Sequence, residues 1–585
     1  MTRSGFFGNP ERPLFGWLHP VAGSPSTGVV LCPPLGQEAL YTHRSMQAAA
    51  MALAACGLPC LRLDAAGTGN AADGPEDPEH GAVPAWQASL EQAVEQLCRT
   101  TGVTRVVLMA VRGATLLAAP VAARHPQVLA LVGLAPVLSG RTMLREWRAL
   151  AATAALREEH GDGALEVAGV FHSAATLRAL GSLSVPDLAW PVDKPVWLLD
   201  RDDLPAAARW AEQLQAQGVQ VAARRCQGLS AMLLEPHRQR VPQAALDELA
   251  EALQAWAATL PAREQPAAPE RPRGPGVGEW LGWAEVAPGV REQVWCVDGP
   301  GGPLYGVLSE PAPPCQPQAM LLLPNTGAIH HVGNHRLYVQ MARALAAQGC
   351  RVVRMDLSGL GESPARPGEA SDVVYGRHAL EDVAAVVQAA RAQWPTQRIS
   401  MLGLCAGGYH ALRSAVQGLQ LDQVIVVNPL VYHWHEGLTL DAHAPRVQEA
   451  YYRARWRSIS GWKRLLTGRS DLRQLLRVMA GGLWRRLKQM PAAMLRLSRR
   501  SGAVDDLNAD LLAVSKQGVR MHFVFSEDEP GWPALQAQGG RALKALQARG
   551  ALTVSHVPRA DHTFTTALAR QRLLARAAAL MSPGR

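Results

Sequence analysis

The stretch Ile399-Ser-Met-Leu-Gly-Leu-Cys-Ala-Gly-Gly-Tyr409 decides how the second half of the chain folds. Its apolar first part predicts a buried strand, and its glycines predict a tight turn that leads into a helix. Because Gly403 and Gly407 flank Cys405, the backbone can turn sharply enough to lift the thiol out of the sheet, and a helix N-terminus lowers the pKa of a thiol. The stretch predicts a reactive Cys405 and acyl-transfer chemistry; the alternative is a buried Cys after an ordinary Gly-rich turn.

Length and composition limit the class of protein. A chain of 585 residues, 48% of them hydrophobic, exceeds what one core usually organises, so we expect at least two globular domains. No apolar run is long enough to span a bilayer and the first residues lack a signal-peptide profile, which predicts a cytoplasmic protein. The nine Cys are scattered, without a CxxC pair or a Cys/His cluster, so we expect no disulfide framework and no structural metal. The Gly-x-Gly after Asp64 and Asp356 lacks a third spaced glycine, so we expect no nicotinamide, flavin or other cofactor.

The basic charge of the chain lies in one segment. Fourteen Lys or Arg stand between Arg453 and Arg500 against Asp471 alone, a local charge of +13 within a net charge of +9, which leaves about −4 elsewhere. Trp and Leu residues between them give an amphipathic helical pattern. We therefore expect no nucleic-acid partner. The segment is either a solvated helical face or a surface that contacts an anionic substrate, a carrier or a membrane.

The chain repeats one order of elements on either side of a Pro-rich segment. Residues 261–278 are polar, rich in Pro and without periodicity, which predicts a linker between domains at 1–260 and 279–585. Each half has an apolar strand with a Pro/Gly turn, an Ala-rich helix, and a second strand that ends in Asp-x-x-Gly-x-Gly, at Asp64 and at Asp356.

A third strand and turn follow in each half, with Arg112 placed 48 residues after Asp64 and Cys405 placed 49 residues after Asp356. Strands that alternate with helices predict the α/β class, with a mostly parallel sheet covered on both faces by helices in each half of the chain. The longer helical stretches after each turn predict insertions above the carboxyl ends of the strands, the second of them a basic lid at about 432–515.

Each half resembles the α/β-hydrolase fold. The C-terminal half is similar to the serine-aminopeptidase and exosortase-associated hydrolases through Asn325-Thr-Gly327, His335-Arg-Leu-Tyr338, Asp356-Leu-Ser-Gly-Leu-Gly-Glu-Ser363 and Asp561-His-Thr563. The N-terminal half looks like a degenerate sister group through Pro33-Pro34, Arg112-Gly-Ala114, Pro136-Val-Leu-Ser-Gly140 and Glu235-Pro-His-Arg238.

The resemblance implies a catalytic triad in the order nucleophile, acid, histidine. Cys405 takes the nucleophile position, Asp528 the acid position with Glu527 as a substitute, and His562 the position of the base. The base would accept the thiol proton, and the acid would fix the tautomer of the imidazole.

An oxyanion hole would come from the backbone N–H of Ala406 and one from Thr326 or a neighbour. The nearby His330, His331 and His335 would contact substrate or cap the helix that starts near His335.

The N-terminal half departs from this pattern. Arg112 occupies its nucleophile position, and a guanidinium cannot attack a carbonyl, so we expect no hydrolysis there. One interpretation is a scaffold in which Asp202 or Asp203 neutralises Arg112. The other is an anion-binding pocket in which Arg112 holds a carboxylate or phosphate.

Three functions remain open. The favoured one is a Cys-dependent hydrolase of an ester or thioester, for which an acyl-carrier protein or CoA is the expected acyl carrier. The second is an acyltransferase that passes the Cys-bound acyl group to an alcohol or amine. The third is a non-catalytic binding or scaffold protein. The exosortase-associated likeness points toward exopolysaccharide or secondary-metabolite assembly by resemblance alone.

Overall fold

The computed structural model describes residues 2–261, 280–435 and 505–582, except residues 75, 155, 157 and 159. The chain divides into two compact units, which are described separately. Unit 1 comprises Met1–Met320, Ala328–Asp372 and Phe564–Arg585, and unit 2 comprises Leu321–Gly327 and Val373–Thr563. Nearly all of the predicted linker and most of the predicted basic lid lie outside the described residues. The predicted boundaries at the linker stay a prediction.

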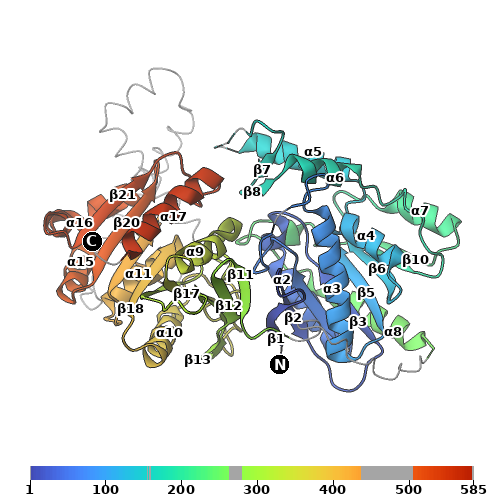
Figure 1. Ribbon diagram of the computed structural model, residues 1–585, viewed down its shortest axis with the longest axis horizontal. Coiled ribbons are helices and arrows are strands. Elements are labelled where there is room, and N and C mark those ends of the chain that lie inside the picture. The colour runs from blue at the N-terminus through green and yellow to red at the C-terminus, as the bar shows by residue number, and fades with distance from the viewer. Residues whose placement is uncertain are drawn as a thin grey trace, which may run out of the picture. The chain divides into compact units, whose positions relative to one another are not determined.

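Unit 1 contains an eight-stranded sheet (Figure 1). Its first two strands pair antiparallel, β2 also pairs antiparallel with β4, and the strands from β4 to the far edge are parallel. The order across the sheet is β1 (Arg3–Phe7), β2 (Leu14–His19), β4 (Cys60–Asp64), β3 (Thr27–Cys32), β5 (Arg105–Val111), β6 (Val128–Leu134), β9 (Val196–Arg201) and β10 (Val221–Cys226).

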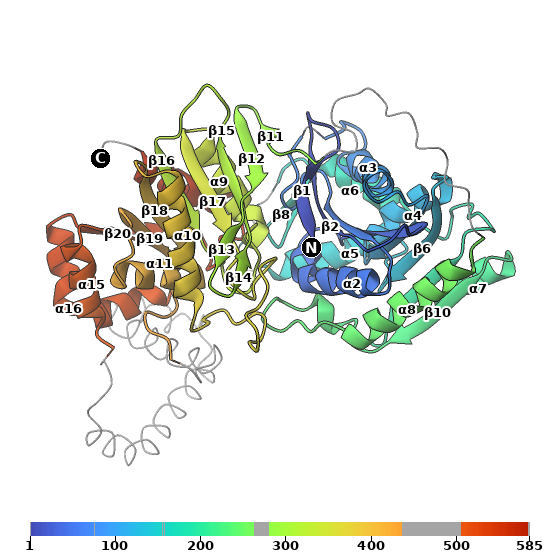
Figure 2. The same cartoon turned by 90° about the horizontal axis from the view of Figure 1, so that it is seen from below.

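Helices cover both faces of this sheet, so most of its strands are buried on both sides, whereas the edge strand β10 is largely exposed. One face packs against α2 (His43–Ala55) and α8 (Gln243–Thr259), which lie together on one side in Figure 2. The other face packs against a larger set: α3 (Val83–Thr101), α4 (Ala114–Arg124), α5 (Gly140–Thr153), α6 (Ala174–Ser182) and α7 (Ala208–Ala216). Short elements complete this part of the unit: α1 (Glu38–Tyr41), β7 (Leu165–Val167), β8 (Val170–His172) and η1 (Ala231–Leu233).

Unit 1 also includes the first strands after the linker. An antiparallel series runs through β11 (Ala284–Ala287), β12 (Val290–Val294), β15 (Gly306–Pro311) and β17 (Cys350–Met355). Buried aromatic residues of β1 and β2 pack with Val290 and Val307 of this series in one apolar cluster. The remaining elements of the unit are β13 (Val297–Gly299), β14 (Gly302–Leu304), η2 (Asn334–Arg336), α9 (Leu337–Ala346) and α17 (Ala567–Met581).

Unit 2 is built on parallel strands. β18 (Arg398–Leu404), β19 (Gln423–Val427), β20 (Arg520–Ser526) and β21 (Leu552–Val557) pair in this order, and β16 (Ala319–Leu323) stands next to β18. Their helices are α10 (Ala379–Gln393), α11 (Ala406–Val416), α15 (Leu507–Lys516) and α16 (Gly531–Ala548). Since parallel strands place their carboxyl ends on one edge, the residues after β18, β19, β20 and β21 meet there.

The predicted α/β class is confirmed, with mostly parallel strands and flanking helices. The tandem relationship of the two halves and the lid stay predictions. Among the described residues, no helix combines the length and the apolar character that crossing a bilayer requires.

Candidate active site in unit 2

Cys405 lies in a strained turn between β18 and α11. Its φ of 57° and ψ of −115° are rare for a residue with a side chain, and its N–H donates to the carbonyl of Val427 at 2.9 Å. A Cβ at Gly403 would stand 1.9 Å from the carbonyl carbon of Gly407, so the turn closes only with glycine at position 403. The turn leaves Cys405 partly exposed at the carboxyl edge of the sheet.

The start of α11 provides N–H groups beside the thiol. The Cys405 carbonyl accepts hydrogen bonds from the N–H of Gly408 and of Tyr409, at 3.1 and 3.3 Å. Ala406 is the first residue of the helix, so its own N–H has no acceptor one turn earlier. This N–H is suited to an oxyanion that forms at a carbonyl attacked by Cys405.

His562 lies in the loop after β21 and is held by Glu529. Its Nδ1 is 3.1 Å from both carboxylate oxygens of Glu529, whose side chain is buried. The carboxylate accepts the Nδ1 proton, which leaves Nε2 to act on another group. Nε2 is buried and has no hydrogen-bond partner among the described residues.

Electrostatics link this imidazole to Cys405. Burial lowers the pKa of His562, but interaction with Cys405 and with Glu529 outweighs burial and raises that pKa well above its usual value of 6.5. Neighbouring groups that can carry negative charge favour the charged form of an imidazole. The imidazole of His562 therefore interacts with Cys405 on one hand and with Glu529 on the other, which makes it the candidate proton acceptor for the thiol.

The prediction of Asp528 as the acid is corrected by this geometry. Asp528 is exposed and has a φ of 60°, which turns the chain so that the next residue, Glu529, points back to the sheet. Glu529 is only 5% exposed and holds His562. The substitute acid Glu527 is also exposed and accepts the N–H of Arg559 at 2.7 Å.

Two further side chains fix Glu529 and the loop of His562. The hydroxyl of Ser526 donates to Glu529 Oε2 at 3.0 Å, and the N–H of Ser526 donates to Asn428 Oδ1 at 2.8 Å. Asn428 Nδ2 donates to the carbonyl of His562 at 2.8 Å. Asn428 directly follows β19 and has a φ of 44°. Its hydrogen bonds connect the end of β19 with the end of β20 and with the loop after β21. The sequence analysis did not single out Asn428 or Ser526. The available signal was their position at the carboxyl ends of two predicted parallel strands, where the side chains of a site gather.

Aromatic side chains gather next to the turn. Tyr375 packs in an apolar cluster with Ala406 and Val431, and its ring stacks on Trp434 with centroids 4.2 Å apart. The buried Tyr375 hydroxyl has no hydrogen-bond partner among the described residues. Burial raises the pKa of Tyr375, and the neighbouring Cys405 raises it further. A neutral hydroxyl close to Cys405 is therefore available to a bound substrate.

The other predicted site residues of the C-terminal half belong to different units. Thr326 belongs to unit 2, where it is buried after β16, and its part in an oxyanion hole stays a prediction. His330, His331 and His335 belong to unit 1. There His331 Nδ1 contacts Asp356 at 2.7 Å, and His335 has a φ of 53° next to α9.

Arg112 in unit 1 is already neutralised. Its Nε donates to Glu38 at 3.0 Å and its Nη2 to Glu146 at 2.5 Å, and the guanidinium is buried. The predicted partners were wrong, since Asp203 pairs with Arg201 instead. An incoming anion would meet two carboxylates, so the geometry gives no support to an anion-binding pocket at Arg112.

One group of side chains among the described residues could hold a metal ion. Glu158, His160 and Glu166 of unit 1 offer ligand atoms within 4.8 Å of one another. Arg570 also binds Glu166 at 3.2 Å, so a positive charge already occupies part of that group. None of these residues belongs to the Cys405 site.

A comparison with models of known families finds a match for part of the chain. Residues 317–524 match the model of the serine aminopeptidase family, S33. This match includes Cys405 and ends before Glu529 and His562. A search of curated proteins finds no match.

Among solved structures, the chain is similar to XC6422 of Xanthomonas campestris, an α/β serine hydrolase without a lid. The identity is 17% over 50% of this chain and 96% of that one, with a TM-score of 0.30. A serine hydrolase homologue from Coxiella burnetii is 14% identical over 50% of this chain and 97% of that chain, with a TM-score of 0.30. Est1E of Butyrivibrio proteoclasticus is 15% identical over 44% of this chain and 98% of that chain, with a TM-score of 0.32.

Proposed function

We propose that unit 2 is a thiol-dependent hydrolase of carboxylic esters or thioesters. The observation that carries the proposal is that a thiol, an imidazole and a carboxylate lie at the same edge of one sheet. Cys405 sits in the strained turn, His562 presents a buried Nε2 without a partner among the described residues, and Glu529 accepts the Nδ1 proton. Nucleophile, base and orienting carboxylate are the parts that acyl transfer needs.

In the acylation step, Cys405 Sγ attacks the carbonyl carbon and forms an S–C bond. The carbonyl oxygen becomes an oxyanion, for which the Ala406 N–H is the candidate donor. When the bond to the leaving oxygen or sulfur breaks, His562 Nε2–H gives its proton to that atom. In deacylation His562 accepts a proton from water, the hydroxide oxygen bonds to the carbonyl carbon, and the thiolate leaves with the acid as product.

The aromatic cluster favours an acyl donor with an apolar part. Tyr375, Tyr409 and Trp434 offer flat apolar surface, and the unpartnered Tyr375 hydroxyl offers one hydrogen bond. An acyl chain or an aromatic leaving group would use both features. Delivery on CoA or on an acyl-carrier protein belongs to this proposal, as does contact of the basic segment with the carrier or with a membrane.

The same cluster favours transfer to an alcohol or amine as the second candidate. Apolar rings beside a thioester exclude water, and a thioester reacts readily with amines. Product analysis separates the two: hydrolysis gives free acid with or without an added amine, whereas transfer gives an amide or ester whose yield depends on the acceptor.

The experiment is incubation of the full chain with a mixture of acyl-CoA thioesters, followed by peptide mass spectrometry. We expect an acyl mass increase on the peptide that contains Cys405 and none in Cys405→Ala. Cys296 and Cys315 are the internal controls, because both are exposed and neither has a place in the proposed site. Equal acylation of all three thiols would overturn the proposal.

A further inference from the structure

Unit 1 contains a cavity of about 370 Å³. All of its lining residues belong to this unit, so it is separate from the Cys405 site. Residues 33–37, which follow β3, and Asp64 at the end of β4 form one side. Residues 169–172 contribute another part of the wall, together with His330, Val332, His335 and Arg336. β3 and β4 are parallel neighbours, and open α/β sheets bind ligands at the edge where such strands end.

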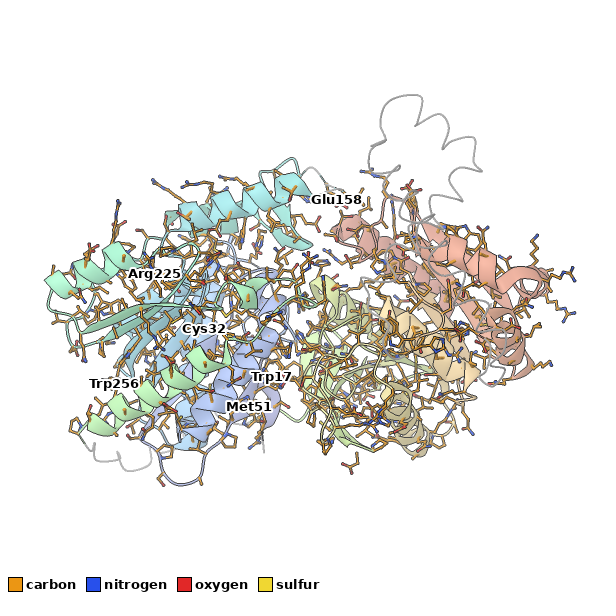
Figure 3. The ribbon with its side chains drawn as sticks, turned by 180° about the vertical axis from the view of Figure 1, so that it is seen from behind. Trp17, Cys32, Met51, Glu158, Arg225 and Trp256 are labelled. Atoms are coloured by element: carbon orange, nitrogen blue, oxygen red, sulfur yellow. The ribbon has the colours of Figure 1, made fainter. Side chains whose placement is uncertain are left out.

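The wall of the cavity is largely aromatic and apolar. Trp17, which is labelled in Figure 3, lines it together with Pro34 and Trp86. Phe171 also lines it and is 48% exposed, which is unusual for a large apolar side chain. The volume and the apolar lining fit a small organic molecule.

The charged side chains of the wall already have partners. Arg62 binds Glu362 through two hydrogen bonds of 2.9 and 2.7 Å. Asp64 accepts the N–H of Asn70 at 2.8 Å. The other charged lining residues are likewise engaged: Arg12, His43, Asp73, Glu76, Arg336 and Arg570. A charged ligand would therefore have to compete with contacts that these side chains already make.

Uncharged polar groups of the wall, in contrast, are left without partners among the described residues. Trp17 Nε1, His172 Nε2 and His330 Nδ1 are buried and make no hydrogen bond there. Burial lowers the pKa of His172 to about 4 and that of His330 well below its usual value, so both rings are neutral at pH 7. Buried polar atoms are normally satisfied, so these three groups of the lining residues are available as hydrogen-bond partners for a bound molecule.

We infer that this cavity of unit 1 binds an uncharged small molecule with an aromatic or other flat apolar body and a hydroxyl or carbonyl group. Flat apolar walls hold the body, and the neutral imidazoles and the indole N–H are the partners of the polar group. Arg112 holds the nucleophile position of this half and is paired with Glu38 and Glu146, so the molecule is bound without being converted. The inference is independent of the function proposed for unit 2.

Calorimetric titration of the full chain with three naphthalene probes at pH 7 tests the inference. The probes are neutral 2-naphthol, anionic 2-naphthoate and cationic 2-naphthylmethylammonium. We expect one equivalent of 2-naphthol to bind at least tenfold more tightly than either charged probe. His172→Phe keeps a flat ring against Trp147 but loses the nitrogen, and it should weaken 2-naphthol binding.

A matched pair of substitutions in α3 locates the binding. Ala85 lines the cavity and Ala88, on the same helix, does not. Ala85→Phe should weaken 2-naphthol binding at least tenfold, while Ala88→Phe should leave it within twofold. Equal binding by the two variants, absence of binding up to 1 mM, or equal binding of the charged probes would each overturn the inference. Alkylation of Cys405 should stay unchanged in both variants, which keeps this test distinct from that of unit 2.

Discussion

Glu529, and not the Asp528 before it, holds the imidazole of His562, with both carboxylate oxygens 3.1 Å from Nδ1. The burial of Glu529 makes this contact effective, because water does not compete for the carboxylate. The Ser526 hydroxyl binds the same carboxylate at 3.0 Å and limits its rotation. The contact fixes which nitrogen of His562 faces away from Glu529.

Replacement of Glu529 should therefore impair the thiol. In Glu529→Gln the imidazolium loses its buried counter-charge, and the rate of Cys405 alkylation by iodoacetamide at pH 6 should fall at least about tenfold. Asp528→Asn changes an exposed neighbour and should leave the rate within about twofold. Mass spectrometry of the Cys405 peptide over time gives both rates. The assignment of the acid fails if Asp528→Asn is the slower variant.

The carboxylate that holds His562 could not be chosen from the sequence alone. The turn at Cys405 could be predicted, because the spacing of Gly403 and Gly407 has a local steric cause. Ser526 is followed by three acids, and only the positive φ of Asp528 decides which of them faces the sheet. The residue types of this turn do not encode that dihedral angle, so the choice among the three acids had to come from the structure.

The partners of Arg112 were beyond prediction for a similar reason. Glu38 and Glu146 come from α1 and α5, at sequence distances of 74 and 34 residues. Their approach depends on how those helices pack above the strand ends. The residue type alone correctly excluded a nucleophile, since a guanidinium is not nucleophilic at any position. Its surroundings had to come from the structure.

Gly403 should tolerate no side chain. Gly403→Ala forces a methyl group into the backbone of Gly407, and we expect the free energy of unfolding to fall by at least about 3 kcal/mol. Gly418→Ala is the control, since it has a φ of 82° but its nearest contact is 4.0 Å away. It should cost about 1 kcal/mol for the backbone conformation alone. Urea denaturation measures both, and equal losses would show that the contact between Gly403 and Gly407 is unimportant.

Arg112 should be a structural residue. Arg112→Met leaves two carboxylates uncompensated, and burial already raises the pKa of Glu38 against the effect of Arg112. We expect a loss of about 3–5 kcal/mol in the free energy of unfolding. Arg124→Met removes an exposed pair with Glu91 and should change stability by less than about 1 kcal/mol. A stable Arg112→Met protein, with stability like that of Arg124→Met, would contradict the structural role.

His410 should make the protein less stable in mild acid. Burial lowers its pKa from 6.5 to about 4, so between these values the unfolded chain binds a proton that the folded chain does not. Stability then falls as pH decreases, and His410 alone should remove about 2 kcal/mol between pH 7 and pH 5.

His410→Gln is the test variant, since its amide can still donate to the Val374 carbonyl as Nε2 does at 3.0 Å. Its unfolding free energy should depend less steeply on pH than that of the unmodified protein. Identical pH slopes in urea denaturation would show that His410 does not titrate with the expected sign.

The most direct test of the account is the pH dependence of Cys405 alkylation, with the exposed Cys315 of the same chain as internal reference. If His562 holds a thiolate at Cys405, Cys405 should react at least tenfold faster than Cys315 at pH 6, and His562→Ala should abolish this advantage. A Cys405 rate that follows that of Cys315 from pH 6 to pH 9, or one unchanged in His562→Ala, would contradict a catalytic Cys405.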